Sequence, residues 1–109
     1  MLKFELHFMY YSKFDEDSLE EQTTTVEADT INEAIDKMYY YLEDFENYVL
    51  AVFFGDEDIQ WYEYYENPRT IRNNIDVTLS FKGKSKHFKN AHTFESYLFK
   101  YFKDEMEAL

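Results

Sequence analysis

Alternation of apolar and polar residues in two segments, interrupted only by Met9, constrains the fold of this chain more than any other feature. Residues 2–10 carry Leu, Phe or Tyr at every second position, and residues 75–81 carry Ile, Val, Leu or Phe in the same way. A period of two places all the apolar side chains on one face of a β-strand. The two segments therefore predict two strands of a sheet with one buried face.

The residues between these segments predict a hairpin partner and a helix. Residues 22–28 are rich in β-branched side chains and follow a polar turn at 15–18, so they predict a strand that returns beside the first. The sequence from Thr30 to Glu33 fits a capping box, in which the hydroxyl and the carboxylate satisfy backbone amides at a helix start. The expected inner face of this helix is Ile31, Ala34, Ile35, Met38, Leu42 and Phe45.

The rest of the chain predicts further strands and a second helix. Residues 48–54 are apolar without alternation, which is typical of a central strand, and residues 59–66 predict another strand after a turn at 55–58. Gly83 permits a tight turn before a short edge strand at 85–89. A last helix is expected to begin at Asn90 or Thr93 and to reach about Ala108. Its expected inner face is Phe94, Leu98, Tyr101 and Phe102.

The predicted order is β-β-α-β-β-β-(β)-α. This order indicates an α+β fold with two layers, in which two helices cover one face of a mainly antiparallel sheet. We expect the other face of the sheet to carry many Tyr side chains. A chain of 109 residues is typical of a single domain, so residues 1–109 are predicted to form one.

Charge is distributed unevenly along the chain. The formal net charge is −12. Residues 1–66 contain 18 acids and three bases, a charge of −15, whereas residues 67–109 contain five acids and eight bases, a charge of +3. Such an acidic balance disfavours direct binding to nucleic acid or to an anionic membrane surface, because phosphates would be repelled. Without Cys or an apolar leader segment, the sequence predicts a cytoplasmic protein, in the host cell if a phage encodes it.

Motifs for catalysis, metal binding or cofactor binding do not stand out. The two Gly residues cannot form a glycine-rich phosphate loop, and the chain has no Gly-x-Ser-x-Gly sequence. The three histidines (His7, His87 and His92) do not form a His-Glu-x-x-His helix, and the consecutive acids at 15–17 and 56–58 lack the alternating ligands of a calcium loop. We therefore expect no enzyme activity, metal or cofactor; a small enzyme with an unrecognised pocket is the alternative.

Acidic and aromatic residues are the predicted partner-binding set. Tyr and Trp are enriched at interaction hot spots, and carboxylates attract a basic partner. The predicted residues are Asp15, Glu16, Asp17, Glu20, Glu21, Asp56, Glu57, Asp58, Trp61, Tyr62, Glu63, Tyr64 and Glu66. An acidic surface that only maintains solubility, and tyrosines that only pack in a sheet, are the simpler explanations of the same residues.

A basic segment at 82–89 has the opposite character. Its cationic residues are Lys82, Lys84, Lys86, His87 and Lys89. They could contact phosphate or the acidic surface of a second copy in a homodimer. Lysines also protect an exposed edge strand from aggregation, which is the simpler explanation.

These features favour a non-enzymatic inhibitor. The acidic charge before Asn67 is comparable in number with the phosphates of one turn of B-DNA. In composition the chain resembles phage and plasmid inhibitors of restriction and CRISPR systems, which are small, acidic and free of Cys. The hypothesis is an acidic DNA mimic that occupies the basic nucleic-acid-binding surface of a partner protein, such as a nuclease of a host defence system. The alternatives are an immunity protein or antitoxin against a basic nuclease toxin, and a nucleic-acid binder that uses Lys82–Lys89.

Overall fold

The computed structural model describes residues 1–11, 19–53 and 70–109. These residues form an α+β fold, as the sequence predicts. The strands are β1 (Leu2–Tyr11), β2 (Leu19–Ala28), β3 (Ile75–Phe81) and β4 (Lys84–Phe88). The helices are α1 (Ile31–Phe53), α3 (Thr70–Asn73), α4 (Ala91–Lys100) and α5 (Phe102–Glu107).

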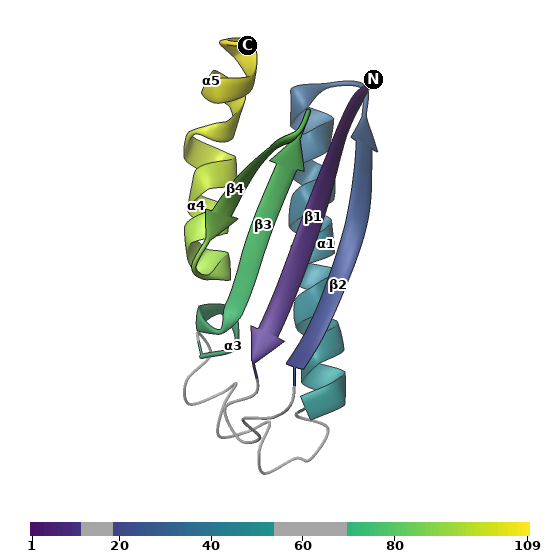
Figure 1. Ribbon diagram of the computed structural model, residues 1–109, viewed down its shortest axis with the longest axis vertical. Helices are drawn as coiled ribbons and strands as arrows, with labels where there is room; N and C mark the ends of the chain where they lie inside the picture. Colours follow the sequence, from purple (N-terminus) through teal and green to yellow (C-terminus); the bar gives the residue numbers. More distant parts are fainter. Residues whose placement is uncertain (12–18, 54–69) are drawn as a thin grey trace.

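The four strands form one antiparallel sheet in the order β2-β1-β3-β4 (Figure 1). The predicted hairpin between β1 and β2 is confirmed, and Phe4 pairs with Val26. The pairing of β1 with β3 brings together the two alternating segments, with Phe8 opposite Val77. β2 and β4 are the two edges of this sheet.

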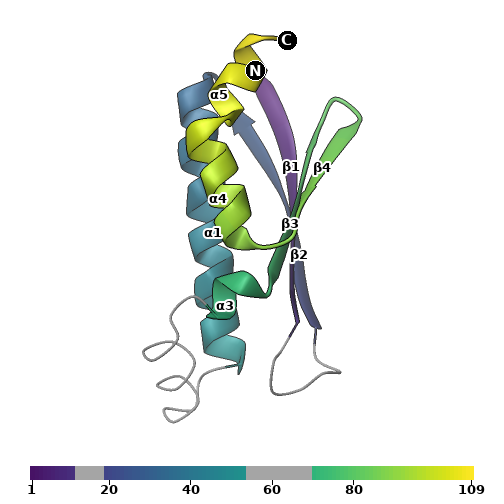
Figure 2. The same ribbon diagram turned by 90° about the vertical axis from the view of Figure 1, so that its left-hand side faces the viewer.

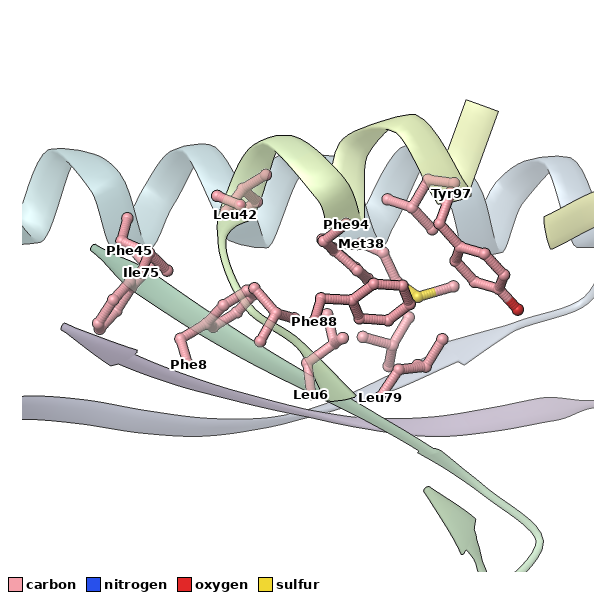
Figure 3. Packing of buried hydrophobic residues seen from close by; sticks show 14 of the residues in the cluster. Leu6, Phe8, Met38, Leu42, Phe45, Ile75, Leu79, Phe88, Phe94 and Tyr97 are labelled. Carbon is pink, nitrogen blue, oxygen red and sulfur yellow. The ribbon is translucent and has the colours of Figure 1, made fainter. Parts of the chain in front are cut away.

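The core lies between the sheet and the helices. Every second residue of β1, from Phe4 to Tyr10, is fully buried. In Figure 2 the helices lie to one side of the sheet. Figure 3 shows Leu6 and Phe8 of the sheet pointing toward Met38 and Phe45 of α1. Phe8 and Phe45 stack with ring centroids 5.3 Å apart, so the two layers meet through aromatic contacts.

The start of α1 matches the predicted capping box. The Thr30 hydroxyl accepts a hydrogen bond from the Glu33 amide at 3.1 Å, and the Glu33 carboxylate accepts one from the Asp29 amide at 3.2 Å. The side-chain contact with Lys37 and the bond from Asp29 lower the pKa of Glu33. These contacts satisfy backbone donors that a helix otherwise leaves free at its first turn.

The predicted central strand at 48–54 is wrong, because α1 continues through Phe53. Val49 lies four residues after Phe45 and is fully buried, so it extends the helical stripe of core residues. Val52 and Tyr48 are exposed, whereas a central strand would bury both faces. The β-branched and aromatic residues of this segment have a weak strand preference that packing on the sheet overrides.

The last helix is divided in two. Asn90 is its N-cap, one of the two predicted alternatives, and its side-chain oxygen accepts from the Thr93 amide at 2.9 Å. α4 ends at Lys100, and α5 begins after Tyr101, whose φ of −123° interrupts the helix. The prediction that Tyr101 faces the core is wrong, since it is 60% exposed, and Tyr97 is buried instead. The change of direction at Tyr101 rotates the following residues relative to a continuous helix.

In the described strands the open face of the sheet is mainly polar and carries one tyrosine, Tyr11; the prediction of many tyrosines on this face also rested on the strand at 59–66, which lies outside the described residues. Most residues of this face are Glu, Thr, Ser, His, Lys or Asp, with Thr23, His7, Thr78 and His87 in one row across the four strands. Its apolar members are Met9, Tyr11 and Leu19. Short polar and β-branched side chains suit such a solvated face. Most described tyrosines lie on α1 and α4 instead.

The predicted strand at 59–66 and the turns at 15–18 and 55–58 lie outside the described residues. No helix within 1–11, 19–53 or 70–109 is long and apolar enough to cross a membrane.

Candidate functional site

The acidic and basic parts of the sequence lie on different sides of the folded molecule. Residues 19–53, which form β2 and α1, contain nine carboxylates and one lysine, a formal charge of −8. Residues 70–109, which form β3, β4 and the C-terminal helices, have a charge of +2. Figure 1 shows β2 and α1 along one long side of the molecule and β4 with α4 along the other. Charge of one sign therefore gathers on one side.

We call the solvent-facing carboxylates of that side the acidic side. Its members are Glu20, Glu21, Glu27, Asp29, Asp36, Glu43 and Asp44. Glu33 is excluded because it forms an ion pair with Lys37 at 3.0 Å, and Glu46 because it is paired with Arg72 in the molecule's interior. The acidic side thus consists of carboxylates that are at least partly exposed.

The helix α1 gives this side its length and stiffness. A helix of 23 residues is about 34 Å long, which is close to the length of one turn of B-DNA. Tyr48 ties the helix to β2, because its hydroxyl donates to the Glu20 carboxylate at 3.0 Å. The negative charge of Glu20 and this bond raise the pKa of Tyr48. The carboxylates of β2 and α1 are therefore held in a fixed relation.

An internal charge cluster fixes the other flank of α1. Arg72 of α3 donates to Glu46 of α1 at 2.8 Å and to Glu95 of α4 at 2.7 Å. The Arg72 and Glu46 side chains are only 16% and 13% exposed. Burial alone would lower the pKa of Arg72. Its bonds to Tyr39 and Glu46 and the charges of both carboxylates have the larger opposite effect, so the pKa is raised above its usual value. Arg72 therefore stays charged and joins three helices.

Only two of the thirteen residues predicted to bind a partner lie in the described residues. Glu20 and Glu21 are near the start of β2, at the sheet edge. Glu21 accepts from the His7 ring at 3.0 Å on the open face of the sheet. The other eleven residues, including Trp61, Tyr62 and Tyr64, lie outside the described residues.

The structure adds residues that the sequence reasoning did not select. Asp36, Glu43 and Asp44 are exposed on α1. Tyr40 is 62% exposed on the same helix, so an aromatic ring lies among these acids. A helical projection would have found them, because positions 36, 40, 43 and 44 recur at intervals of three and four residues. The selection of consecutive acids in turns overlooked this periodicity.

The basic segment forms the opposite edge of the sheet. Lys84, Lys86 and His87 lie on β4, Lys82 lies in the turn before it, and Lys89 directly follows it. The predicted edge strand is confirmed. Lys82 lies over the Phe81 ring and Lys86 over the Tyr97 ring, with nitrogen-to-centroid distances of 5.2 and 4.4 Å. Lys86 also pairs with Glu105 at 3.3 Å, and His87 lies 3.5 Å from Asp76. Much of this positive charge already has partners inside the molecule.

Histidine and carboxylate side chains do not gather into a metal site in the described part of the chain. His7 and His87 each contact a single carboxylate, on different strands.

Comparisons with known proteins add no family. No protein-family model matches the chain, and neither a curated protein nor a solved structure shows significant similarity to it.

Proposed function

We propose that this chain is a non-enzymatic inhibitor that uses its acidic side to occupy a basic, nucleic-acid-binding surface of a partner protein. The observation that carries the proposal is the concentration of negative charge on β2 and α1, since residues 19–53 have a formal charge of −8 and α1 is about 34 Å long. One strand of B-DNA carries about ten phosphates over that length. The seven carboxylates of the acidic side, which lie on β2, on α1 and in the turn between them, approach that number, so a basic groove would attract the protein as it attracts DNA.

The attraction is expected to act mainly on the rate of association. Exposed charges contribute little affinity singly, but a field of one sign steers an oppositely charged partner into contact. Tyr40 and Tyr48, exposed on α1, supply apolar contact area once the partner is bound. Nucleases and other defence enzymes that hold nucleic acid in a basic channel are the partner class that fits this chemistry.

The basic edge gives weaker support to direct nucleic-acid binding. Lys86 is shared between Glu105 and the Tyr97 ring, and His87 lies beside Asp76. Phosphate contacts would have to replace these internal partners. The acidic side would at the same time repel a long polyanion.

A charge-reversal experiment tests the proposal. The variant D36K/E43K/D44K changes three exposed acids of α1, and E5K/D104K/E107K changes three exposed acids elsewhere, so both variants have a net charge of −6. Each chain is used to capture proteins from a nuclease-treated host lysate. A captured protein is then purified, and the chain is tested for displacement of labelled DNA or RNA from it.

We expect wild type and the E5K/D104K/E107K control to displace nucleic acid, with association that slows as NaCl is raised. The α1 variant should associate at least about tenfold more slowly, because charged residues at an interface act on the association rate. Equal inhibition by both variants, or binding that leaves the partner's nucleic-acid complex intact, would contradict the proposal. A captured toxin encoded beside this chain would instead identify an immunity protein.

A further inference from the structure

A cavity of about 250 Å³ opens between the β3–β4 hairpin and α5. In Figure 2 the end of the hairpin diverges from the helices at the end of the molecule where α5 lies. The two-residue turn at Lys82 and Gly83, with φ of 50° and 80°, has the strong twist of a hairpin turn. The break at Tyr101 separates α5 from α4. Sheet and helices therefore separate here, and a space remains.

The wall of this cavity is apolar and largely aromatic. It includes Phe4, Leu79, Phe81, Phe102 and Met106. The Phe4 ring stacks on Phe81 at 4.6 Å between centroids and lies 5.5 Å from Phe102. These contacts fix the rings, so the wall exists before any ligand arrives. A preformed apolar wall of this kind favours a ring or a short alkyl chain.

The charged side chains that line the cavity are two lysines, Lys84 and Lys86, and one glutamate, Glu105. Tyr97 donates to the Glu105 carboxylate at 2.5 Å, and Lys86 pairs with the same carboxylate. Glu105 is thus already satisfied by two donors. Lys84 also lines the cavity, and no partner for it is found in the described residues. One ammonium group therefore remains to bind an anion beside the apolar wall.

We propose that this cavity binds a small apolar carboxylate, with its ring or chain against the Phe4–Phe81–Phe102 wall and its carboxylate at Lys84. The volume limits the ligand to a single ring with a short chain or to a medium alkyl chain. The site lies at the basic edge of the molecule, away from the acidic side, so it does not depend on the proposed inhibitor function.

A matched series of ligands tests the site. The probes are 4-phenylbutyrate, 4-phenyl-1-butanol and 4-phenylbutylamine, which share one apolar body and differ in charge. Binding is followed by the NMR signals of the methyl groups of Met106 and Leu79 in the cavity wall. The methyl groups of Met38 and Ile75 in the core, which do not line the cavity, serve as internal references.

Three variants separate charge from shape. We expect K84E to weaken 4-phenylbutyrate binding by about fivefold or more, because one exposed ion pair contributes up to about a factor of five and the reversed charge adds repulsion. Binding of 4-phenyl-1-butanol should be unchanged. K89E makes the same charge change on a residue outside the cavity lining and should leave 4-phenylbutyrate binding nearly unchanged. M106W should fill the cavity and abolish binding of both ligands, while urea unfolding confirms that this variant is folded.

The proposal is overturned if 10 mM 4-phenylbutyrate leaves the Met106 and Leu79 signals unmoved. It is also overturned if the amine binds as well as the carboxylate, or if K84E and K89E have equal effects. Selective movement of the cavity signals by the carboxylate, lost in K84E and M106W, would establish the site.

Discussion

At the scale of single residues, Arg72 has the strongest local influence on the fold. It joins α3 to α1 and α4 through two carboxylates, one of which is almost buried. Replacing Arg72 by Met leaves the Glu46 carboxylate without its cation in a poorly solvated position. Removal of one partner from a buried pair is more costly than removal of the whole pair.

We expect R72M to lower the free energy of unfolding by roughly 2–3 kcal/mol, measured by urea titration at pH 7. The triple variant R72M/E46Q/E95Q is the control, because it removes the charges together. It should recover a large part of the loss. A triple variant as unstable as R72M would show that the loss comes from packing of the arginine chain and not from the unpaired carboxylates.

The Tyr97–Glu105 pair predicts a pH-dependent effect. The bond from Tyr97 and the pairing with Lys86 lower the pKa of Glu105 from its usual 4.5. A carboxyl group whose pKa is lower in the folded state stabilises the fold above its unfolded pKa, and this stabilisation is lost as the pH falls through the folded value. Burial and the same bond raise the pKa of Tyr97, so its phenol stays protonated and remains the donor.

Y97F keeps the buried ring and removes the donor. It should be less stable than wild type by about 1 kcal/mol at pH 7, and the difference should shrink below about pH 4.5 as Glu105 becomes protonated. Urea unfolding of both proteins at pH 7 and at pH 3 measures this difference. A difference that is independent of pH would contradict the assigned hydrogen bond.

At the scale of elements, the second half of α1 differs most from the sequence prediction. A helix buries Val49 and exposes Val52, whereas the predicted central strand would bury both. V49D should therefore lower the free energy of unfolding by more than about 3 kcal/mol, or prevent folding, because it places a charge in the core. V52D should change it by less than about 0.5 kcal/mol. Comparable losses for the two variants would support the strand.

The β3–β4 turn offers an opportunity for stabilisation. Lys82 and Gly83 both have positive φ, the geometry of a two-residue type I′ turn, which favours Asn before Gly. K82N should raise the free energy of unfolding by about 0.5–1 kcal/mol, since Lys adopts this conformation at a cost that Asn largely avoids. K84N, on the adjacent strand position, is the control. A destabilised K82N protein would contradict the turn assignment.

Elements with one clear pattern could be predicted from the sequence. β3 alternates strictly and β1 does so apart from Met9, and the start of α1 carries a complete capping box, so local signals and packing agree there. The end of α1 could not be predicted, because Val, Tyr and Phe are compatible with both a strand and a buried helix. The break at Tyr101 has no Gly or Pro to signal it. The position of the break depends on which of Tyr97, Tyr101 and Phe102 packs into the core.

The sequence predicted the sign of the charge at the candidate site, but not which residues form the site. Counting charges identified an acidic first part of the chain, and that part includes the acidic side. The individual residues depend on which acids face solvent on a helix. Asp36, Glu43 and Asp44 lie within the helix that the sequence predicts, and a helical projection places them opposite its apolar stripe, but selecting runs of consecutive acids overlooked them.

At the scale of the whole molecule, like charges lie close together on the acidic side. Their repulsion opposes the folded state most at low salt. The Debye length, over which charges still interact, is about 30 Å at 0.01 M and falls to about 3 Å at 1 M. The free energy of unfolding should therefore rise with NaCl over this range. D36K/E43K/D44K should show a smaller rise, because three repelling charges are reversed. An equal rise in both proteins would assign the effect to general salting-out rather than to the acidic side.

The opposite charges of the two sheet edges have a consequence for encounters. β2 at one edge has three glutamates and no base, and β4 at the other has two lysines and no acid. The described residues therefore form an electric dipole directed across the strands. In the field of a basic partner a dipole experiences a torque, so the molecule rotates before contact and presents β2 and α1 first. A larger share of collisions is then productive, while two copies of the chain meet with their matching edges in mutual repulsion.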